Sequence, residues 1–244
     1  MNMVEQQTKI KSVKMKMYVL LNLIFLAFHF TNINAQDSLK KEIITAEEMM
    51  EWQTLDIGKR TIVDNSIVVE ETAGSNGFFL INPKVYHGDV IIKYQVKAIS
   101  TSSVLITLFS VLDIQQEGQL TLPPENSSGR EIWNWRSTLQ HYNLTFNNAS
   151  HGYKPFFYKN LSPRSKGFHN TLSDNITEIG KWYDVEIGKV GERLWFKLND
   201  DLIFDVVDCS PLSSGQLIFR ISGSNSDEVI FAKAAFRNLV VFSE

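Results

Sequence analysis

The residues best suited to chemistry in this sequence gather between positions 133 and 169. From His141 to Asn147 the odd positions are polar and the even positions are apolar or aromatic. A period of two predicts a β-strand with one polar face and one apolar face. A polar strand face that carries His and Asn, with Trp and Tyr close by in the sequence, is typical of a groove that binds sugars.

Four side chains in this stretch are predicted to act in catalysis: His141, Asn143, Tyr158 and Arg164. Elimination from a uronic acid needs a cationic or amide group to neutralise the carboxylate and a base to take the C5 proton. Arg164 would meet the carboxylate, with Arg136 and Lys159 as alternatives, and Asn143 would share it. His141 or Tyr158 would be the base. The competing interpretation of His141 is a hydrogen-bonded structural histidine.

Sugar rings also present apolar C–H faces to aromatic side chains and hydroxyl groups to polar ones. The side chains predicted to bind substrate are Trp133, Trp135, Arg136, Tyr153, Lys159, Asn160 and His169. The sequence is equally consistent with a groove and a core position for Trp133 and Trp135. The alternation places Tyr142 in the core.

The sequence lacks the residue patterns that several other reaction types require. Retaining glycoside hydrolysis needs two close carboxylates, and the spacing E-x-D-x-x-E does not occur in this sequence. G-x-S-x-G and zinc-ligand spacings are also missing from it. Asp200, Asp201, Asp205 and Asp208 are expected to serve a turn and a solvated sheet edge, with a structural calcium site as the alternative. No cofactor is predicted.

The chain begins like an exported protein. Four lysines between positions 9 and 16 precede an apolar run at 18–30, which is too short to span a bilayer comfortably. This pattern predicts a signal peptide over residues 1–35 with cleavage near Ala35, and hence a secreted or periplasmic protein. An uncleaved anchor is the alternative. Residues 36–50 are expected to form an arm across the domain.

Charge and cysteine content limit which partners and which disulfides are expected. Cleavage would remove four lysines and one glutamate, so the 24 basic and 27 acidic residues would become 20 and 26. A net negative chain disfavours a nucleic-acid partner, and no membrane contact is expected after cleavage. A lone cysteine forms no internal disulfide, and Cys209 is predicted to be buried because it follows an apolar run.

The remaining pattern is that of an all-β protein. Residues 103–112 are almost wholly apolar, which predicts a central strand covered on both faces. No long amphipathic helix is expected after residue 112, and residues 113–130 are expected to be a loop. Short strands then follow at regular spacing with turn signals between them. We therefore expect residues 51–244 to form a single antiparallel β-sandwich.

Several segments carry a family resemblance: GDVIIKYQV, SSVLITLFSVLD, HYNLTFNN, YKNLSPRSKGF, LNDDLIFDVVD and AAFRNLVVF. Over roughly residues 50–244 the chain resembles the jelly rolls of the concanavalin A-like lectin/glucanase superfamily, and most of all the YesU-like family of unknown function. The resemblance implies a concave sheet that binds glycans. It also implies a role in an exported polysaccharide-degradation system.

The chain departs from the family pattern in two places. Asn143 stands where the family has His, and Tyr158-Lys159-Asn160 stands where it has Arg-Lys-Asn. Two functions are left open. One is an enzyme that cleaves an acidic polysaccharide, by elimination or glycosidase-like chemistry. The other is a non-catalytic, lectin-like glycan-binding module. The sequence favours the enzyme slightly, because no accompanying catalytic domain is visible beside the single predicted one.

Overall fold

A computed structural model describes residues 38–113, 116, 120–125, 127–147, 154–161, 165–172, 176–224 and 229–244, with the backbone alone for 165–169. The predicted signal peptide and its cleavage point near Ala35 lie outside the described residues. Residues Lys40–Glu244 form one compact unit. No helix in the described part of the chain is long and apolar enough to cross a membrane.

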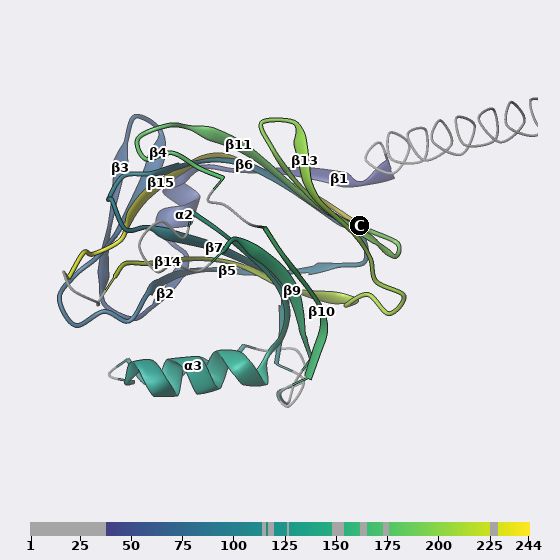
Figure 1. Ribbon diagram of the computed structural model, residues 1–244, viewed down its shortest axis with the longest axis horizontal. Coiled ribbons are helices and arrows are strands. Elements are labelled where there is room, and N and C mark those ends of the chain that lie inside the picture. Colours follow the sequence, from purple (N-terminus) through teal and green to yellow (C-terminus); the bar gives the residue numbers. More distant parts are fainter. Residues whose placement is uncertain are drawn as a thin grey trace, which may run out of the picture. The chain divides into compact units, whose positions relative to one another are not determined.

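Two antiparallel sheets make up this unit (Figure 1), which confirms the predicted all-β sandwich. The eight-stranded sheet contains β1 (Lys40–Ile44), β3 (Gly58–Val63), β4 (Ser66–Glu71), β6 (Val90–Ala98), β11 (Tyr183–Val190), β12 (Arg193–Leu198), β13 (Asp201–Val207) and β15 (Lys233–Ser243). The seven-stranded sheet contains β2 (Gln53–Leu55), β5 (Phe78–His87), β7 (Val104–Leu112), β8 (Gln140–Phe146), β9 (Phe156–Leu161), β10 (Ser165–Thr171) and β14 (Ser214–Ser222).

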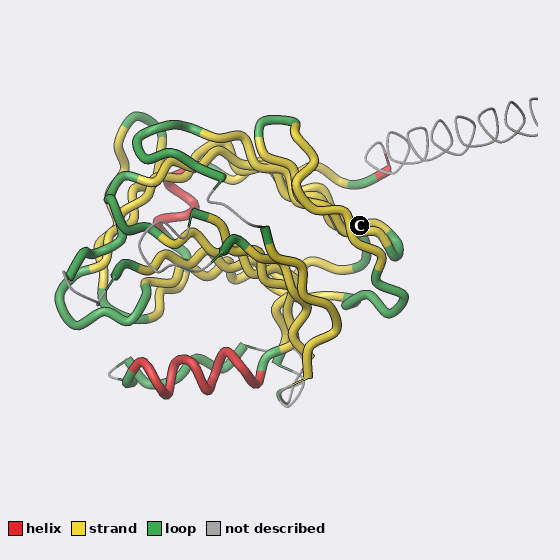
Figure 2. Tube along the Cα trace, viewed as in Figure 1, coloured by secondary structure: helices red, strands yellow, loops and turns green. Residues whose placement is uncertain are grey.

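The two sheets face each other (Figure 2), and the main core between them is built from alternate side chains of both. Its centre is aromatic: the ring centroids of Phe219 and Phe236, on opposite sheets, lie 4.7 Å apart, and Tyr94 lies 4.9 Å from Phe219. Burial of such large apolar side chains is the main force that holds two sheets together.

The strand β7 is central in the seven-stranded sheet, between β8 and β14, as its apolar sequence predicts. Leu105 and Phe109 face the main core, whereas Ile106 and Leu108 face a second apolar cluster on the outer side of the sheet. Both faces are therefore covered, which explains the absence of alternation in this strand.

The second cluster is covered by the helix α3 (Gly129–Thr138), which starts at the end of the predicted loop 113–130, in a part of the chain where no long amphipathic helix was expected. The helix begins at a capping box: the backbone N–H of Ser128 donates to the carboxylate of Glu131 at 2.7 Å, and the Ser128 hydroxyl accepts from the Glu131 N–H at 3.4 Å. Ile132 is buried against the sheet. Trp133, Trp135 and Arg136 thus lie on a helix.

The predicted arm forms regular structure. Residues of β1 pair with β15, with Lys40 opposite Ser243, and the short helix α2 (Ala46–Met50) follows. Cys209 is exposed, which contradicts its predicted burial. The apolar run before it ends with β13 at Val207, and the cysteine lies in the bend that follows.

Candidate functional site

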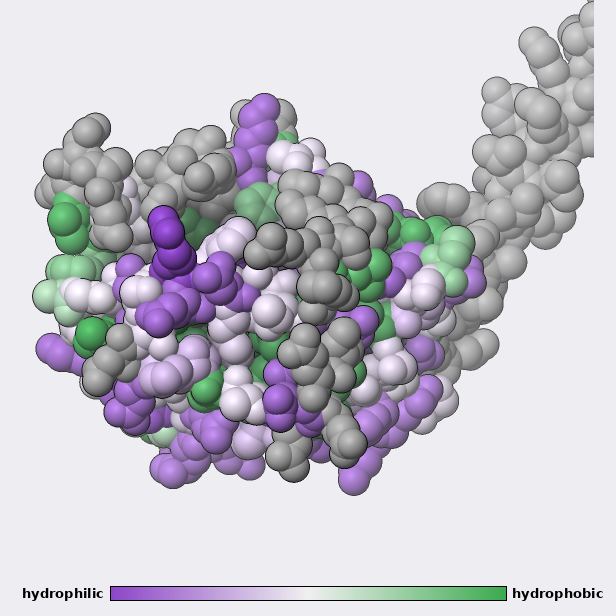
Figure 3. Space-filling view, turned by 90° about the horizontal axis from the view of Figure 1, so that it is seen from below, coloured by the Kyte–Doolittle hydropathy of each residue, from purple (hydrophilic) through white to green (hydrophobic). Residues whose placement is uncertain are grey.

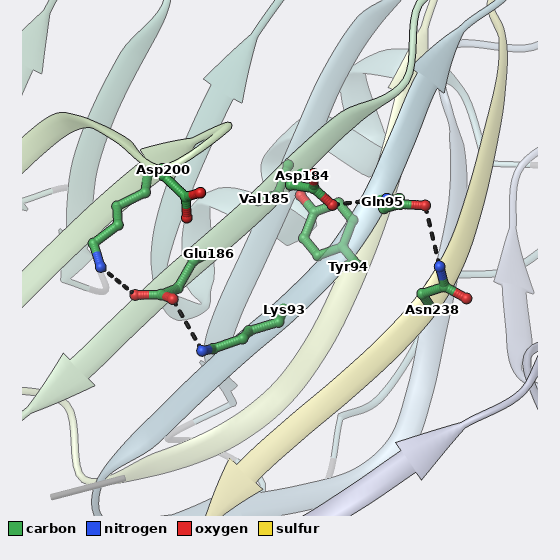
Figure 4. A pocket seen from close by; sticks show the side chains of 9 residues that line it. Lys93, Tyr94, Gln95, Asp184, Val185, Glu186, Asp200 and Asn238 are labelled. Atoms are coloured by element: carbon green, nitrogen blue, oxygen red, sulfur yellow. Dashed lines mark hydrogen bonds and ion pairs between the residues drawn. The ribbon is translucent and has the colours of Figure 1, made fainter. Parts of the chain in front are cut away.

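One groove lies on the outer face of the eight-stranded sheet, over β6, β11, β12 and β15 (Figure 4). Its volume is about 260 Å³, and most of its lining residues are polar or charged. The carboxylate of Glu186 lies 3.1 Å from the Lys93 ammonium and 2.9 Å from that of Lys197, and it accepts from the Trp195 indole at 2.7 Å. These charges satisfy one another, so they form a paired network on a solvated sheet face.

A different group of polar side chains lies on the outer face of the seven-stranded sheet. This sheet bends at β9 and β10 toward the side on which α3 lies, so α3 sits on its concave face (Figure 1). His141, Asn143 and Thr145 share that face of β8, and Tyr142 faces the core, as the alternation predicted. In the pairing of β8 with β9, His141 is opposite Asn160 and Asn143 is opposite Tyr158.

His141 is held as a neutral base. Its side chain is 1% exposed, and its Nδ1 lies 3.1 Å from the carbonyl oxygen of Leu139. Because a carbonyl only accepts, Nδ1 carries the hydrogen, and the lone pair is on Nε2. Nε2 has no hydrogen-bond partner among the described groups. Burial, followed by the nearby charge of Arg136, lowers the pKa of His141 to about 3.

Arg220 joins this cluster from β14, and the sequence analysis did not identify it. Register places it on the concave face: Arg220 is opposite Ile106 of β7, which is itself opposite Thr145. Its guanidinium lies 5.0 Å from the ring centroid of Phe79 and donates from Nη2 to the Asn76 carbonyl at 2.8 Å. Its buried Nε has no partner in the described structure.

The side chains of this group lie close enough to influence one another's pKa values. Burial, and after it the charge of Arg136, lowers the pKa of Arg220 to about 9, against attraction from Glu71 and Asp56. Burial raises the pKa of the Tyr158 phenol, while Arg136 and Arg220 oppose that rise. The ring of Tyr158 meets that of His141 edge-on, at a centroid distance of 5.9 Å. Two guanidinium groups, a phenol and an imidazole therefore share one region.

The loop that borders Arg220 is firmly held. A methyl group at Gly77 would overlap the Arg220 guanidinium, so the absence of a side chain there makes room for it, and φ at Gly77 is +113°. The buried carboxylate of Glu71 accepts from the backbone of Gly223 at 2.6 Å and of Ala232 at 2.9 Å, and from the Ser75 hydroxyl at 2.9 Å.

The side chains of this cluster differ in exposure. His141 and Asn143 are each 1% exposed, whereas Arg136, Tyr158 and Arg220 are half-buried. We call these five residues the concave cluster. Partly exposed guanidinium groups are suited to a carboxylate, which they can bind through paired hydrogen bonds.

Lys159 does not belong to the concave cluster, which corrects its prediction as a substrate-binding residue. It is opposite Tyr142 in the pairing of β8 with β9, so it faces the core and is 3% exposed. Its ammonium lies 2.9 Å from the carboxylate of Asp208 and donates to the Ser210 carbonyl. Asp208, predicted at a solvated edge, also accepts from the Tyr142 hydroxyl at 2.7 Å.

Other predicted residues support or border the cluster. Asn160 donates to the Leu139 carbonyl at 2.7 Å and so fixes the acceptor of His141. The Trp135 indole donates to Thr121 at 2.8 Å, and Trp133 is 59% exposed.

The remaining predicted positions are those of Arg164, Tyr153 and His169. Arg164 and Tyr153 lie outside the described residues, as does the side chain of His169, whose backbone pairs with Tyr158. Within the described chain, no three His, Cys, Asp or Glu side chains are arranged to hold a metal ion.

Comparison with known proteins agrees with the fold. The sequence matches no family model and no curated protein. Among solved structures, a Bacillus subtilis protein of unknown function with a galectin-like fold has a TM-score of 0.64 at 14% identity, covering 81% of this chain and 91% of its own. The fold is a jelly roll of the galectin-like and glucanase type.

Two further structures are similar. A carbohydrate-binding module, CBM66 from Bacillus subtilis, has a TM-score of 0.50 at 16% identity, covering 79% of this chain and 95% of its own. A β-glucanase from Bacillus licheniformis has a TM-score of 0.51 at 10% identity, covering 79% and 92%. At these identities the similarity establishes the fold alone.

Proposed function

We propose that the concave cluster binds an acidic sugar in an exported polysaccharide-degradation system. The observation that carries this proposal is the pair of half-buried guanidinium groups, Arg136 and Arg220, beside an uncharged histidine. A uronate carboxylate would neutralise the two cations; burial, and after it the charge of Arg136, lowers the pKa of Arg220. The glucanase and carbohydrate-binding module of similar fold support a glycan ligand. Affiliation with the YesU-like family is part of the same proposal.

In the catalytic version, the cluster cleaves the glycan by elimination. The carboxylate lies between Arg136 and Arg220, which stabilise the negative charge that develops when the C5 proton leaves. Nε2 of His141 accepts that proton, the C4–O4 bond breaks, and a C4=C5 double bond forms. The Tyr158 phenol, whose raised pKa keeps it protonated, donates its proton to the departing O4. A bound carboxylate would also raise the pKa of His141 toward a useful range.

The alternative is a non-catalytic, lectin-like module that uses the same arginines. The burial of His141 favours it, since a side chain 1% exposed with a pKa of about 3 is a weak and poorly accessible base. Both versions predict the same ligand, and they differ in whether a bond is broken.

The test uses the protein with a panel of uronate and neutral polysaccharides, followed by ultraviolet absorbance of the unsaturated product and by an assay for new reducing ends. Absorbance that rises on a uronate polymer, and is lost in His141→Gln, would support elimination. New reducing ends without absorbance would mean hydrolysis. Binding without either signal would identify the lectin-like module.

Two substitutions test whether the ligand binds at the concave cluster. Arg220→Gln is expected to weaken uronate binding at least about tenfold, which corresponds to roughly 1.4 kcal/mol. The matched control is Arg193→Gln. Arg193 lies in the eight-stranded sheet, away from the concave cluster, and its partner Asp205 is 2.9 Å away in the same sheet. Equal affinities for the two variants would place the ligand elsewhere and refute the proposal.

A further inference from the structure

The groove on the outer face of the eight-stranded sheet has a fixed polar framework. Gln95 of β6 lies between Asp184 and Asn238 (Figure 4). Its Oε1 accepts from Arg237 at 2.7 Å and from Asn238 at 3.1 Å, and its Nε2 donates to the Asp184 carboxylate at 2.7 Å. Arg237 is held in turn, since its guanidinium lies 4.0 Å from the ring centroid of Trp182. These contacts fix the orientation of the Gln95 amide and of the two side chains bonded to it.

The framework leaves hydrogen-bonding capacity on the surface of the groove. A carboxylate has two acceptor oxygens, and an ammonium has three donors. In the described structure Asp184 accepts through Oδ1 alone, and the Lys197 ammonium pairs only with Glu186, at 2.9 Å. Asp200 has no partner among the described groups, and its carboxylate points into the groove from the turn between β12 and β13 (Figure 4). The groove therefore offers both acceptors and donors to a ligand.

The charge of the lining determines which class of ligand fits. Two basic and three acidic residues line the groove, for a formal charge of −1: Lys93, Lys197, Asp184, Glu186 and Asp200. An acidic sugar would bring its carboxylate against three carboxylates of the protein, which is unfavourable. A neutral sugar fits this lining, because each of its hydroxyl groups can donate to a carboxylate and accept from an ammonium.

The size of the groove limits the ligand as well. Its volume of about 260 Å³ is slightly smaller than the roughly 300 Å³ at which small-molecule pockets begin, so it suits one or two sugar rings. The apolar residues of its lining, Tyr94 and Val185, are 3% and 2% exposed and pack in the main core. Binding would therefore rest on hydrogen bonds made in competition with water, with a dissociation constant on the order of 1 mM.

We propose that this groove is a second sugar site, which binds a neutral monosaccharide or disaccharide. The inference goes beyond the proposed function, because the concave cluster lies on the outer face of the other sheet. That face is on the α3 side, where the described surface is mostly hydrophilic (Figure 3). The two sites have opposite charge preferences, since the concave cluster holds two guanidinium groups and the groove has an excess of carboxylates. The protein would thus bind acidic and neutral sugars independently, on opposite sheets.

The experiment is saturation-transfer NMR of the protein with the neutral disaccharides cellobiose, xylobiose, mannobiose and lactose, and with digalacturonate and glucosamine as charged comparisons. At least one neutral disaccharide should give a saturable response. Asp200→Gly should weaken its binding about tenfold, because a charged acceptor is lost. Glycine fits this turn, since φ at Asp200 is +69°. The matched control is Asp64→Gly, at a φ of +48° in the turn between β3 and β4, and it should bind like the original protein.

Two further variants identify the site. Lys197→Met removes the donor without changing the turn, and it should also weaken the neutral response. Arg220→Gln should lose the response to digalacturonate and keep the neutral one, which separates this inference from the proposed function.

Three results would overturn the inference while leaving the proposed function intact. One is equal neutral binding in Asp200→Gly and Asp64→Gly, which would place the sugar elsewhere. The second is a response to glucosamine without any neutral response, which would mean a site for a cation. The third is a response to digalacturonate alone. A lack of response to every sugar would overturn the inference and count against the proposed function as well.

Discussion

The neutral state of His141 makes a quantitative prediction about stability and pH. An unfolded histidine has a pKa near 6.5, whereas burial and Arg136 lower that of His141 to about 3 in the folded protein. A group whose pKa is lower in the folded state stabilises the protein fully above its unfolded pKa. That stabilisation is lost as the pH falls toward the folded pKa, because the unfolded chain takes up the proton first.

The magnitude follows from the two pKa values. Between them, the free energy of unfolding falls by up to about 1.4 kcal/mol for each pH unit. From about pH 7 to about pH 5, His141 alone should therefore cost roughly 2 kcal/mol. His141→Gln removes this titration and keeps a side chain that can donate to the Leu139 carbonyl.

The assay is urea unfolding of the original protein and of His141→Gln across this pH range. Between about pH 7 and about pH 5, the free energy of unfolding of the original protein should fall by about 2 kcal/mol more than that of the variant. His87→Gln, the same substitution at the exposed end of β5, is the matched control for the change of side chain. Parallel pH profiles for the original protein and His141→Gln would refute the assignment of a buried, neutral histidine.

Two further predictions concern residues outside the concave cluster, and both are measured by urea unfolding. Asp208→Asn leaves the ammonium of Lys159 buried without its counter-charge and should cost about 3–5 kcal/mol, against less than about 1 kcal/mol for the exposed Asp205→Asn. Equal losses for the two would contradict a buried pair. Gly188→Ala places a methyl group in the space of the Trp195 ring and should cost about 1–3 kcal/mol; an unchanged stability would mean that the ring can move aside.

Alternation was the strongest sequence signal. In β8 it predicted correctly that His141 and Asn143 lie on one face and Tyr142 on the other, because only one face of that strand contacts the main core. The same signal was weak in α3, where Ile132 and Trp135, with Leu139 at the C-cap, supply a sparse apolar stripe among polar residues. The capping box at Ser128 was the missed indication of a helix.

The direction of the other side chains depends on partners far away in the sequence. Lys159 faces inward because Asp208, 49 residues later, supplies its counter-charge. Arg220 interrupts an apolar strand, and that interruption was the available hint. Its place in the cluster follows from pairing with β7, more than a hundred residues earlier. Sequence patterns predict which faces exist, and register decides which side chains meet.

The pairing of β1 with β15 has a consequence for folding. Lys40 lies opposite Ser243, so a short turn could join the end of β15 to the start of β1 as a hairpin. A circular permutant with new ends at the exposed turn around Gly191 should keep the same contacts, and hence a similar stability. The longest-range pair among the described strands would become a local hairpin, while β11 and β12 would become distant. Because folding rates of β-proteins depend on contact order, the permutant should change how fast the sandwich forms more than how stable it is.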